Sequence, residues 1–164
     1  MKRTLFSSCQ VLFGLSIVLV SHHALAQCEG DSVSVSLDIT TDAWGYEMYW
    51  ELIPEGGNCG DGSAVLWGGN PDVGCGEDIL GLGGEVYGNN LTVSSPTVCV
   101  AQGSDLVLVH RDSYGDGGSG FGVVLNGAPV LGFQGTGTGN DWPISLDLVD
   151  ELQGQLPCMP LPVS

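Results

Sequence analysis

The sequence predicts an all-β domain, an antiparallel β-sandwich or jelly roll with a long glycine-rich loop stapled by a disulfide. Apolar residues recur at every second position in several segments, and 27 of the 164 residues are glycine. Short apolar runs are separated by clusters of Gly, Asn, Asp and Pro, which favour turns. No segment carries a capped helical stripe of useful length. This combination is typical of short strands packed in two layers.

The first strand is expected at residues 33–39, where valine, leucine and isoleucine alternate with serine and aspartate. Such alternation indicates a strand with one face in the core and the other in water. Asn126 and Gly127 lie between two apolar runs and predict a tight hairpin turn. Further strands are expected at residues 64–67, 91–93, 98–101, 106–111, 121–125, 130–133 and 144–149.

The second strand is expected to begin near residue 48. Met48, Trp50 and Leu52 occupy alternate positions, with Tyr49 and Glu51 between them. We therefore expect Trp50 in the core, and the face that carries Tyr49 and Glu51 in contact with water. The following stretch, from residue 55 to residue 90, has many glycines and little periodicity, so it is expected to be the long loop.

The first 26 residues have the organisation of a signal peptide. A basic start precedes an apolar run at residues 11–20, and a small-x-small cleavage motif ends at Ala26. We expect cleavage after Ala26, one β-sandwich domain over residues 27–153 and an extended proline-containing tail over residues 154–164. The apolar run is short for a membrane span and no second one follows, so no spanning segment is expected.

Strong acidity limits the partners of this chain. It has 19 acidic residues, 3 Lys and Arg residues and a formal net charge of −16 at pH 7. Lys2 and Arg3 lie in the predicted signal peptide, which leaves Arg111 as the base of the exported chain. Such a surface repels nucleic acid and anionic membranes and attracts cations. Solubility in salty media is the simpler explanation of the charge.

The cysteines indicate an oxidising compartment, extracellular or periplasmic, because five of the six follow the predicted cleavage site. We expect Cys59 to pair with Cys75 across the glycine-rich loop, and Cys28 with Cys158 to tie the termini together. Sequence alone leaves the connectivity open. The odd number leaves one thiol free or linked to another chain. A lipid anchor on Cys28 is the alternative, which Gln27 disfavours because a lipobox has a small residue there.

Two acidic loops form the candidate metal site. Asp112 and Asp116 lie four residues apart in a glycine-bent turn, and Asp42 and Glu47 lie between the first two strands. Carboxylate and carbonyl oxygens are the ligands of Ca²⁺. The loops share one end of the sheet if residues 91–101 form one strand, and lie at opposite ends if they form two. The alternative is that these residues only shape tight turns.

Aromatic residues in the same loops are the candidate ligand-binding residues. Trp44, Tyr46 and Tyr114 offer flat apolar faces beside carboxylates, an arrangement that suits polysaccharide. The rival interpretation is that the rings pack beneath the loops, and we favour it for Trp44 and Tyr114 individually because large aromatics are usually mostly buried.

Two motifs carry a resemblance: T-D-x(4)-E-x-x-W from Thr41 and D-S-Y-G-D-G from Asp112. They resemble a secreted β-rich module that recurs in exported and surface proteins of marine and gliding bacteria and in some algae. The similarity covers roughly residues 33–134, and it implies an accessory or adhesive role. The module commonly has cysteines where this chain has Ser104 and residues 118–120, so its disulfide arrangement does not carry over.

Together these observations favour a secreted, non-catalytic binding or adhesion module that is stabilised by Ca²⁺ and attaches to polysaccharide or to a cell-surface or matrix component. One alternative is an acidic matrix protein assembled through divalent ions, and another is a carboxylate-dependent glycoside hydrolase. An enzyme is disfavoured because the nucleophile-elbow, phosphate-loop and dinucleotide motifs are missing. His110 alternates with Leu106 and Leu108, which indicates a histidine in the core or on a sheet face.

Overall fold

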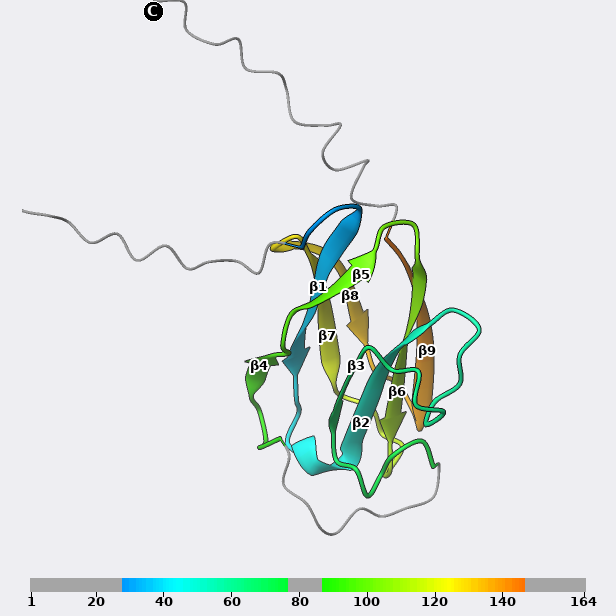
Figure 1. The fold of residues 1–164 in the computed structure, drawn as a ribbon. Helices are drawn as coiled ribbons and strands as arrows, with labels where there is room; N and C mark the ends of the chain where they lie inside the picture. Colours follow the sequence, from blue (N-terminus) through cyan, green and yellow to red (C-terminus); the bar gives the residue numbers. More distant parts are fainter. Residues whose placement is uncertain (1–27, 77–86, 147–164) are drawn as a thin grey trace, which may run out of the picture.

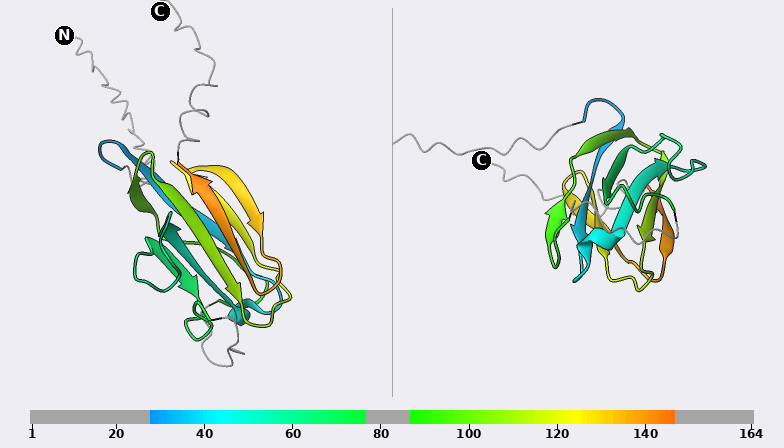
Figure 2. Two further views of the ribbon diagram at one scale, coloured as in Figure 1. Left: turned by 90° about the vertical axis from the view of Figure 1, so that its right-hand side faces the viewer. Right: turned by 90° about the horizontal axis from the view of Figure 1, so that it is seen from below.

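A computed structural model describes residues 28–76 and 87–146 of the chain. These residues form two antiparallel sheets that pack face to face, as Figures 1 and 2 show. The predicted all-β sandwich is therefore confirmed. The predicted signal peptide and the predicted tail lie outside the described residues.

The first sheet is centred on β1, which pairs antiparallel with three other strands. The order is β4-β1-β7-β8, and β5 also pairs with β1. Its strands are β1 (Ser32–Thr40), β4 (Thr92–Ser94), β5 (Val98–Ala101), β7 (Gly120–Leu125) and β8 (Ala128–Gln134).

The second sheet has the order β3-β2-β6-β9. Its strands are β2 (Met48–Pro54), β3 (Leu66–Gly69), β6 (Asp105–Asp112) and β9 (Gly139–Ser145), and the short 3-10 helix η1 (Gly45–Glu47) leads into β2. The last strand begins at Gly139, earlier than the expected residue 144, because β9 pairs with β6 along the whole register from Asp105 to Arg111.

The core lies between the sheets and contains the alternate residues that the sequence analysis placed there. Val35, Leu37 and Leu52 are fully buried, and Trp50 is almost so. His110 is also fully buried, so of its two expected places, the core or a sheet face, it occupies the core. The Asn126-Gly127 turn joins β7 to β8 with positive φ at both residues, the conformation that favours Asn-Gly in two-residue hairpins.

The outer face of β2 differs from expectation. Tyr49 and Glu51 are both buried, whereas the alternation predicted contact with water. The loop that follows β2 folds back over this face, and Gly60 donates its backbone N–H to the Glu51 carboxylate. The alternation correctly identified the core side of β2. It could not predict that a loop would cover the opposite face of the strand.

Two disulfides brace the domain. Cys59 pairs with Cys75, as expected, at a Cα–Cα distance of 5.7 Å. Cys28 pairs with Cys99, at a Cα–Cα distance of 5.6 Å, so the expected pair of Cys28 and Cys158 is wrong. The physical reason is that β5 lies antiparallel beside the start of β1, which brings Cys99 next to the N-terminal segment. Cys158 lies outside the described residues.

Candidate functional site

The two acidic loops meet at one end of the sandwich. Met48, the first residue of β2, pairs with Asp112, the last residue of β6, because these strands are antiparallel. The loop before β2 and the loop after β6 therefore share an end, the lower one in Figure 1. Ser113 donates its backbone N–H to the carbonyl oxygen of Glu47 at 2.9 Å, which joins the two loops directly.

Strand direction explains why the loops meet. β4 and β5 are separate strands, yet both lie antiparallel to β1 and so run the same way. Ser95 lies between them and is held to β1 by two hydrogen bonds, one from its backbone N–H to the Leu37 carbonyl and one from the Leu37 N–H to its hydroxyl oxygen. The segment behaves as one interrupted strand, which is the alternative that places both loops at the same end.

Asp112 organises the turn in which it lies. Its Oδ1 accepts hydrogen bonds from the backbone N–H groups of Tyr114 and Gly115, each at 2.9 Å, and its Oδ2 accepts one from Gly117 at 2.7 Å. The side chain is buried, with 4% of the residue exposed. Asp112 therefore fulfils the turn-forming role that the sequence analysis gave as the alternative to metal binding.

Asp42 does the same in the first loop. Its Oδ1 accepts a hydrogen bond from the backbone N–H of Trp44 at 2.7 Å. Gly118 approaches this carboxylate so closely that a Cβ at residue 118 would overlap it. Gly118 also has a φ of +104°, a backbone conformation that favours glycine. The glycine thus permits the second loop to lie against Asp42.

Carboxylate oxygens of Glu47, Asp112 and Asp116 lie within 4.8 Å of one another. We call these three residues together with Asp42 the acidic cluster. Burial raises the pKa of Glu47, a hydrogen bond with Tyr46 opposes this, and the negative charges of Asp112, Asp116 and Asp42 raise it further. The cluster is therefore a place where negative charge is concentrated and where a cation would relieve repulsion.

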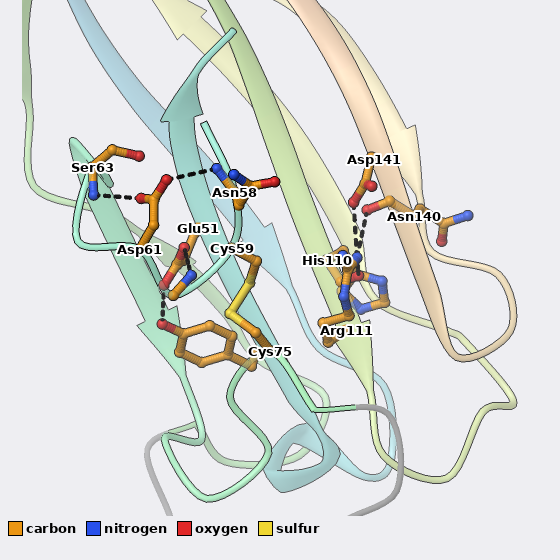
Figure 3. Close-up of a disulfide and its surroundings, with 12 residues drawn as sticks. Glu51, Asn58, Cys59, Asp61, Ser63, Cys75, His110, Arg111, Asn140 and Asp141 are labelled. Carbon is orange, nitrogen blue, oxygen red and sulfur yellow. Dashed lines mark hydrogen bonds and ion pairs between the residues drawn. A yellow bond between two sulfur atoms is a disulfide. The ribbon is translucent and has the colours of Figure 1, made fainter. Parts of the chain in front are cut away.

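No base neutralises this cluster among the residues that the structure describes. Arg111 precedes Asp112 in the chain, but Nη1 of Arg111 lies 2.8 Å from Oδ1 of Asp141 on the neighbouring strand β9. The same nitrogen donates to the carbonyl oxygens of His110 and Asn140, as Figure 3 shows. Arg111 is therefore committed to the outer face of its sheet.

The aromatic residues of the loops are more accessible than we expected. Trp44 is 50% exposed and Tyr114 is 67% exposed, so the interpretation that they pack beneath the loops is wrong. Tyr46 is half-buried and meets Trp44 edge to face, with ring centroids 6.1 Å apart. Short turns held by Asp42 and Asp112 leave no cover over these rings, which places accessible aromatic surface beside the acidic cluster.

A second group of polar and aromatic residues was missed by the sequence analysis. Tyr49 and Glu51 on β2 line a hollow of about 420 Å³ together with Trp67 on β3. The predicted water-facing side of β2 is the signal that such a face exists, but only the fold shows that it is bordered by the loop between β2 and β3, which the Cys59–Cys75 disulfide staples.

Comparisons with protein families, with curated proteins and with solved structures found no match for this chain. Within residues 28–76 and 87–146, no helix has the length and apolar character needed to cross a membrane.

Proposed function

We propose that this chain is an exported, non-catalytic binding module whose loops are fixed by Ca²⁺ and present aromatic side chains to a polysaccharide. The observation that carries the proposal is the convergence of Glu47, Asp112 and Asp116, from two separate loops, within 4.8 Å.

Calcium suits this cluster for two reasons. Ca²⁺ takes six to eight oxygen ligands in flexible geometry, and carboxylates from neighbouring loops with nearby backbone carbonyls supply such a set. Burial raises the pKa of Glu47, and the negative charges of Asp112, Asp116 and Asp42 raise it further. A bound cation would stabilise the ionised form of these crowded carboxylates. A bound ion would also hold the two loops in one relative position.

The exposed aromatic side chains of the two loops are the reason for proposing a polysaccharide ligand. The exposed faces of Trp44 and Tyr114 lie in the same loops as the acidic cluster. Sugar rings have apolar C–H faces that stack on aromatic side chains, while their hydroxyl groups donate to carboxylates. Fixed loops would lower the entropy lost on binding, so calcium and polysaccharide are expected to bind cooperatively.

Thermal unfolding of the purified protein, with added CaCl₂ and with a chelator, tests the calcium site. At a free Ca²⁺ concentration 100 times the Kd, binding stabilises the native state by about 2.7 kcal/mol, so the midpoint is expected to rise by several degrees. Glu47→Gln and Asp116→Asn should abolish the rise.

Glu55→Gln is the matched control, because it removes the same charge at the opposite end of β2, roughly 20 Å away. It should keep the full response to calcium. A midpoint that does not respond to calcium in the unmodified protein, or one that responds equally in all variants, contradicts the site.

Polysaccharide binding is tested separately with Trp44→Ala and Tyr114→Ala. Both should weaken retention in calcium on immobilised polysaccharides that lack amino groups, and Trp67→Ala, on the outer sheet face, should not. Calcium-dependent assembly of many copies without any polysaccharide binding would instead support the matrix alternative.

A further inference from the structure

The outer face of β2 and β3 carries a hollow of a size suited to a small ligand. Its volume of about 420 Å³ falls within the range of roughly 300–1,000 Å³ for small-molecule sites. Glu51 pairs directly with Trp67 across the two strands, and Tyr49 lies two residues before Glu51 on the same face. These three side chains therefore share one surface on the outer face of the sheet, which begins two residues after Glu47 of the acidic cluster.

The stapled loop forms the wall of this hollow. The Cys59–Cys75 disulfide fixes the loop beside Glu51, as Figure 3 shows. Gly60 and Gly62 both have positive φ and both line the hollow. Trp67 remains 61% exposed, so its indole ring offers an accessible aromatic surface at the edge.

Tyr49 and Glu51, the polar side chains that line the hollow, can accept further hydrogen bonds from a ligand. Oε1 of Glu51 accepts the hydroxyl proton of Tyr49 at 2.6 Å, and Oε2 accepts the backbone N–H of Gly60 at 2.9 Å. Burial, followed by the bond to Glu51, raises the pKa of Tyr49, so its proton stays in place. The Tyr49 hydroxyl and the Gly60 N–H thus already donate within the protein. The remaining lone pairs on the oxygens of Glu51 and Tyr49 can accept hydrogen bonds, so a ligand that fits here must donate them.

The negative charge of Glu51 favours a ligand that is both a hydrogen-bond donor and a cation. Glu51 is 95% buried, its hydrogen-bond partners among residues 28–76 and 87–146 are neutral, and Arg111 is held by Asp141. A metal ion is a poor fit, because one carboxylate is far from the oxygen set of Ca²⁺ and the sulfur atoms of Cys59 and Cys75 are joined to each other. An ammonium group supplies three donors and a positive charge, and an adjacent tryptophan face attracts it further.

We propose that this hollow binds an amino-sugar residue of a glycan, with its ammonium group at Glu51 and the C–H face of its ring against Trp67. A pyranose ring suits this place because it offers a flat apolar face and a charged substituent together. The site does not depend on calcium, and it stands whether or not the acidic cluster binds a metal.

The test is isothermal titration of the purified protein, in excess CaCl₂, with three oligosaccharides of equal length built from glucosamine, N-acetylglucosamine or glucose. We expect the glucosamine oligomer to bind at least tenfold more tightly than the other two. Trp67→Ala should weaken its binding about fivefold or more, and the control variant Leu91→Ala, which truncates another exposed apolar side chain outside the hollow, should leave it unchanged.

Glu51→Gln should abolish the preference for the amine over the N-acetyl group. Circular dichroism checks whether the Glu51→Gln variant is folded. If it is unfolded, Trp67→Ala still tests the proposal. Equal binding of all three oligomers, or equal effects of Trp67→Ala and Leu91→Ala, would overturn the proposal. Tighter binding of the glucosamine oligomer when calcium is left out would also overturn it, because calcium would then compete for the amine at the acidic cluster. Equally tight binding of a lysine oligomer would overturn it too, because it would indicate a peptide ligand.

Discussion

His110 is a buried histidine, and neither of its ring nitrogens meets the geometry of a hydrogen bond within residues 28–76 and 87–146. Its ring lies between Phe121, with centroids 5.5 Å apart, and Trp142, with centroids 5.9 Å apart. Burial lowers its pKa, the negative charges of Asp112 and Asp42 and the nearby side chain of Asn140 oppose this, and the positive charge of Arg111 adds to the lowering. The imidazole therefore packs as a core residue between two aromatic rings.

This environment predicts a pH dependence of stability. Below the unfolded-state pKa of about 6.5, the unfolded chain takes up a proton on His110 while the native state does not, so the free energy of unfolding falls as the pH falls. The slope from this residue approaches 1.4 kcal/mol per pH unit at most. His110→Leu should flatten it in denaturant titrations between pH 7.5 and 5.5. Parallel curves for the two proteins would contradict this account.

Asp112 has a structural role that is separable from metal binding. Asp112→Asn replaces one acceptor oxygen with an amide that cannot receive the backbone N–H bonds now made to it. We expect a loss of about 1–3 kcal/mol of stability from the unsatisfied donors, measured by urea unfolding in the presence of a chelator. Asp116→Asn removes the same charge from an exposed residue and should cost little. Equal losses in the two variants would refute the turn-forming role.

Residue-level expectations succeeded where periodicity decides and failed where loop shape decides. Trp50 and His110 follow from alternation along their strands. Trp44 and Tyr114 were expected to pack because of their size, but the turns held by Asp42 and Asp112 are too short to cover them. No property of a single residue encodes how much cover its loop provides.

Among the elements, the stapled loop between β2 and β3 has the most influence on the outer sheet face. Asp61 accepts backbone N–H bonds from Asn58 and Ser63, each at 2.8 Å, which shapes the first part of this loop. The Cys59–Cys75 bond then ties it to the segment that follows β3. The loop lies outside the core between the sheets, so its order depends on this bond more than on apolar packing.

Removing that bond with the double substitution Cys59→Ser and Cys75→Ser should lower the free energy of unfolding by about 3 kcal/mol, as expected for a closed loop of this length. The sandwich itself should persist, because its core residues are elsewhere. Chemical denaturation gives the stability and far-ultraviolet circular dichroism the sheet content, with the Cys28–Cys99 bond verified by peptide mapping. An unchanged midpoint would mean that the loop is held by other contacts.

Element positions were largely predictable, but their partners were not. Alternation located β1, β2, β6 and β7 because each has one face in the core. The pairing of both β4 and β5 with β1 depends on how the chain crosses between sheets, which short-range patterns do not record. The wrong partner for Cys28 is a direct consequence, since Cys99 is brought close only by that pairing.

At the scale of the whole molecule, two distinct surfaces carry the polar chemistry. The acidic cluster lies at one end of the sandwich and the hollow lies on the outer face of the second sheet. The sequence suggested the first surface because its carboxylates are close together in two short motifs. It could not suggest the second, because Glu51 and Trp67 meet only through strand pairing.

The Cys28–Cys99 bond gives the domain a mechanical property. It joins residues that are 71 apart in sequence, and the closed covalent loop contains β1, η1, β2, β3 and β4. A tensile force applied to the chain before Cys28 passes through the disulfide directly into β5 and cannot extend the residues inside the loop. A domain held at a surface by its N-terminal side would therefore keep Asp42, Glu47 and the hollow within an inextensible segment under load, and only the strands after Cys99 could lengthen.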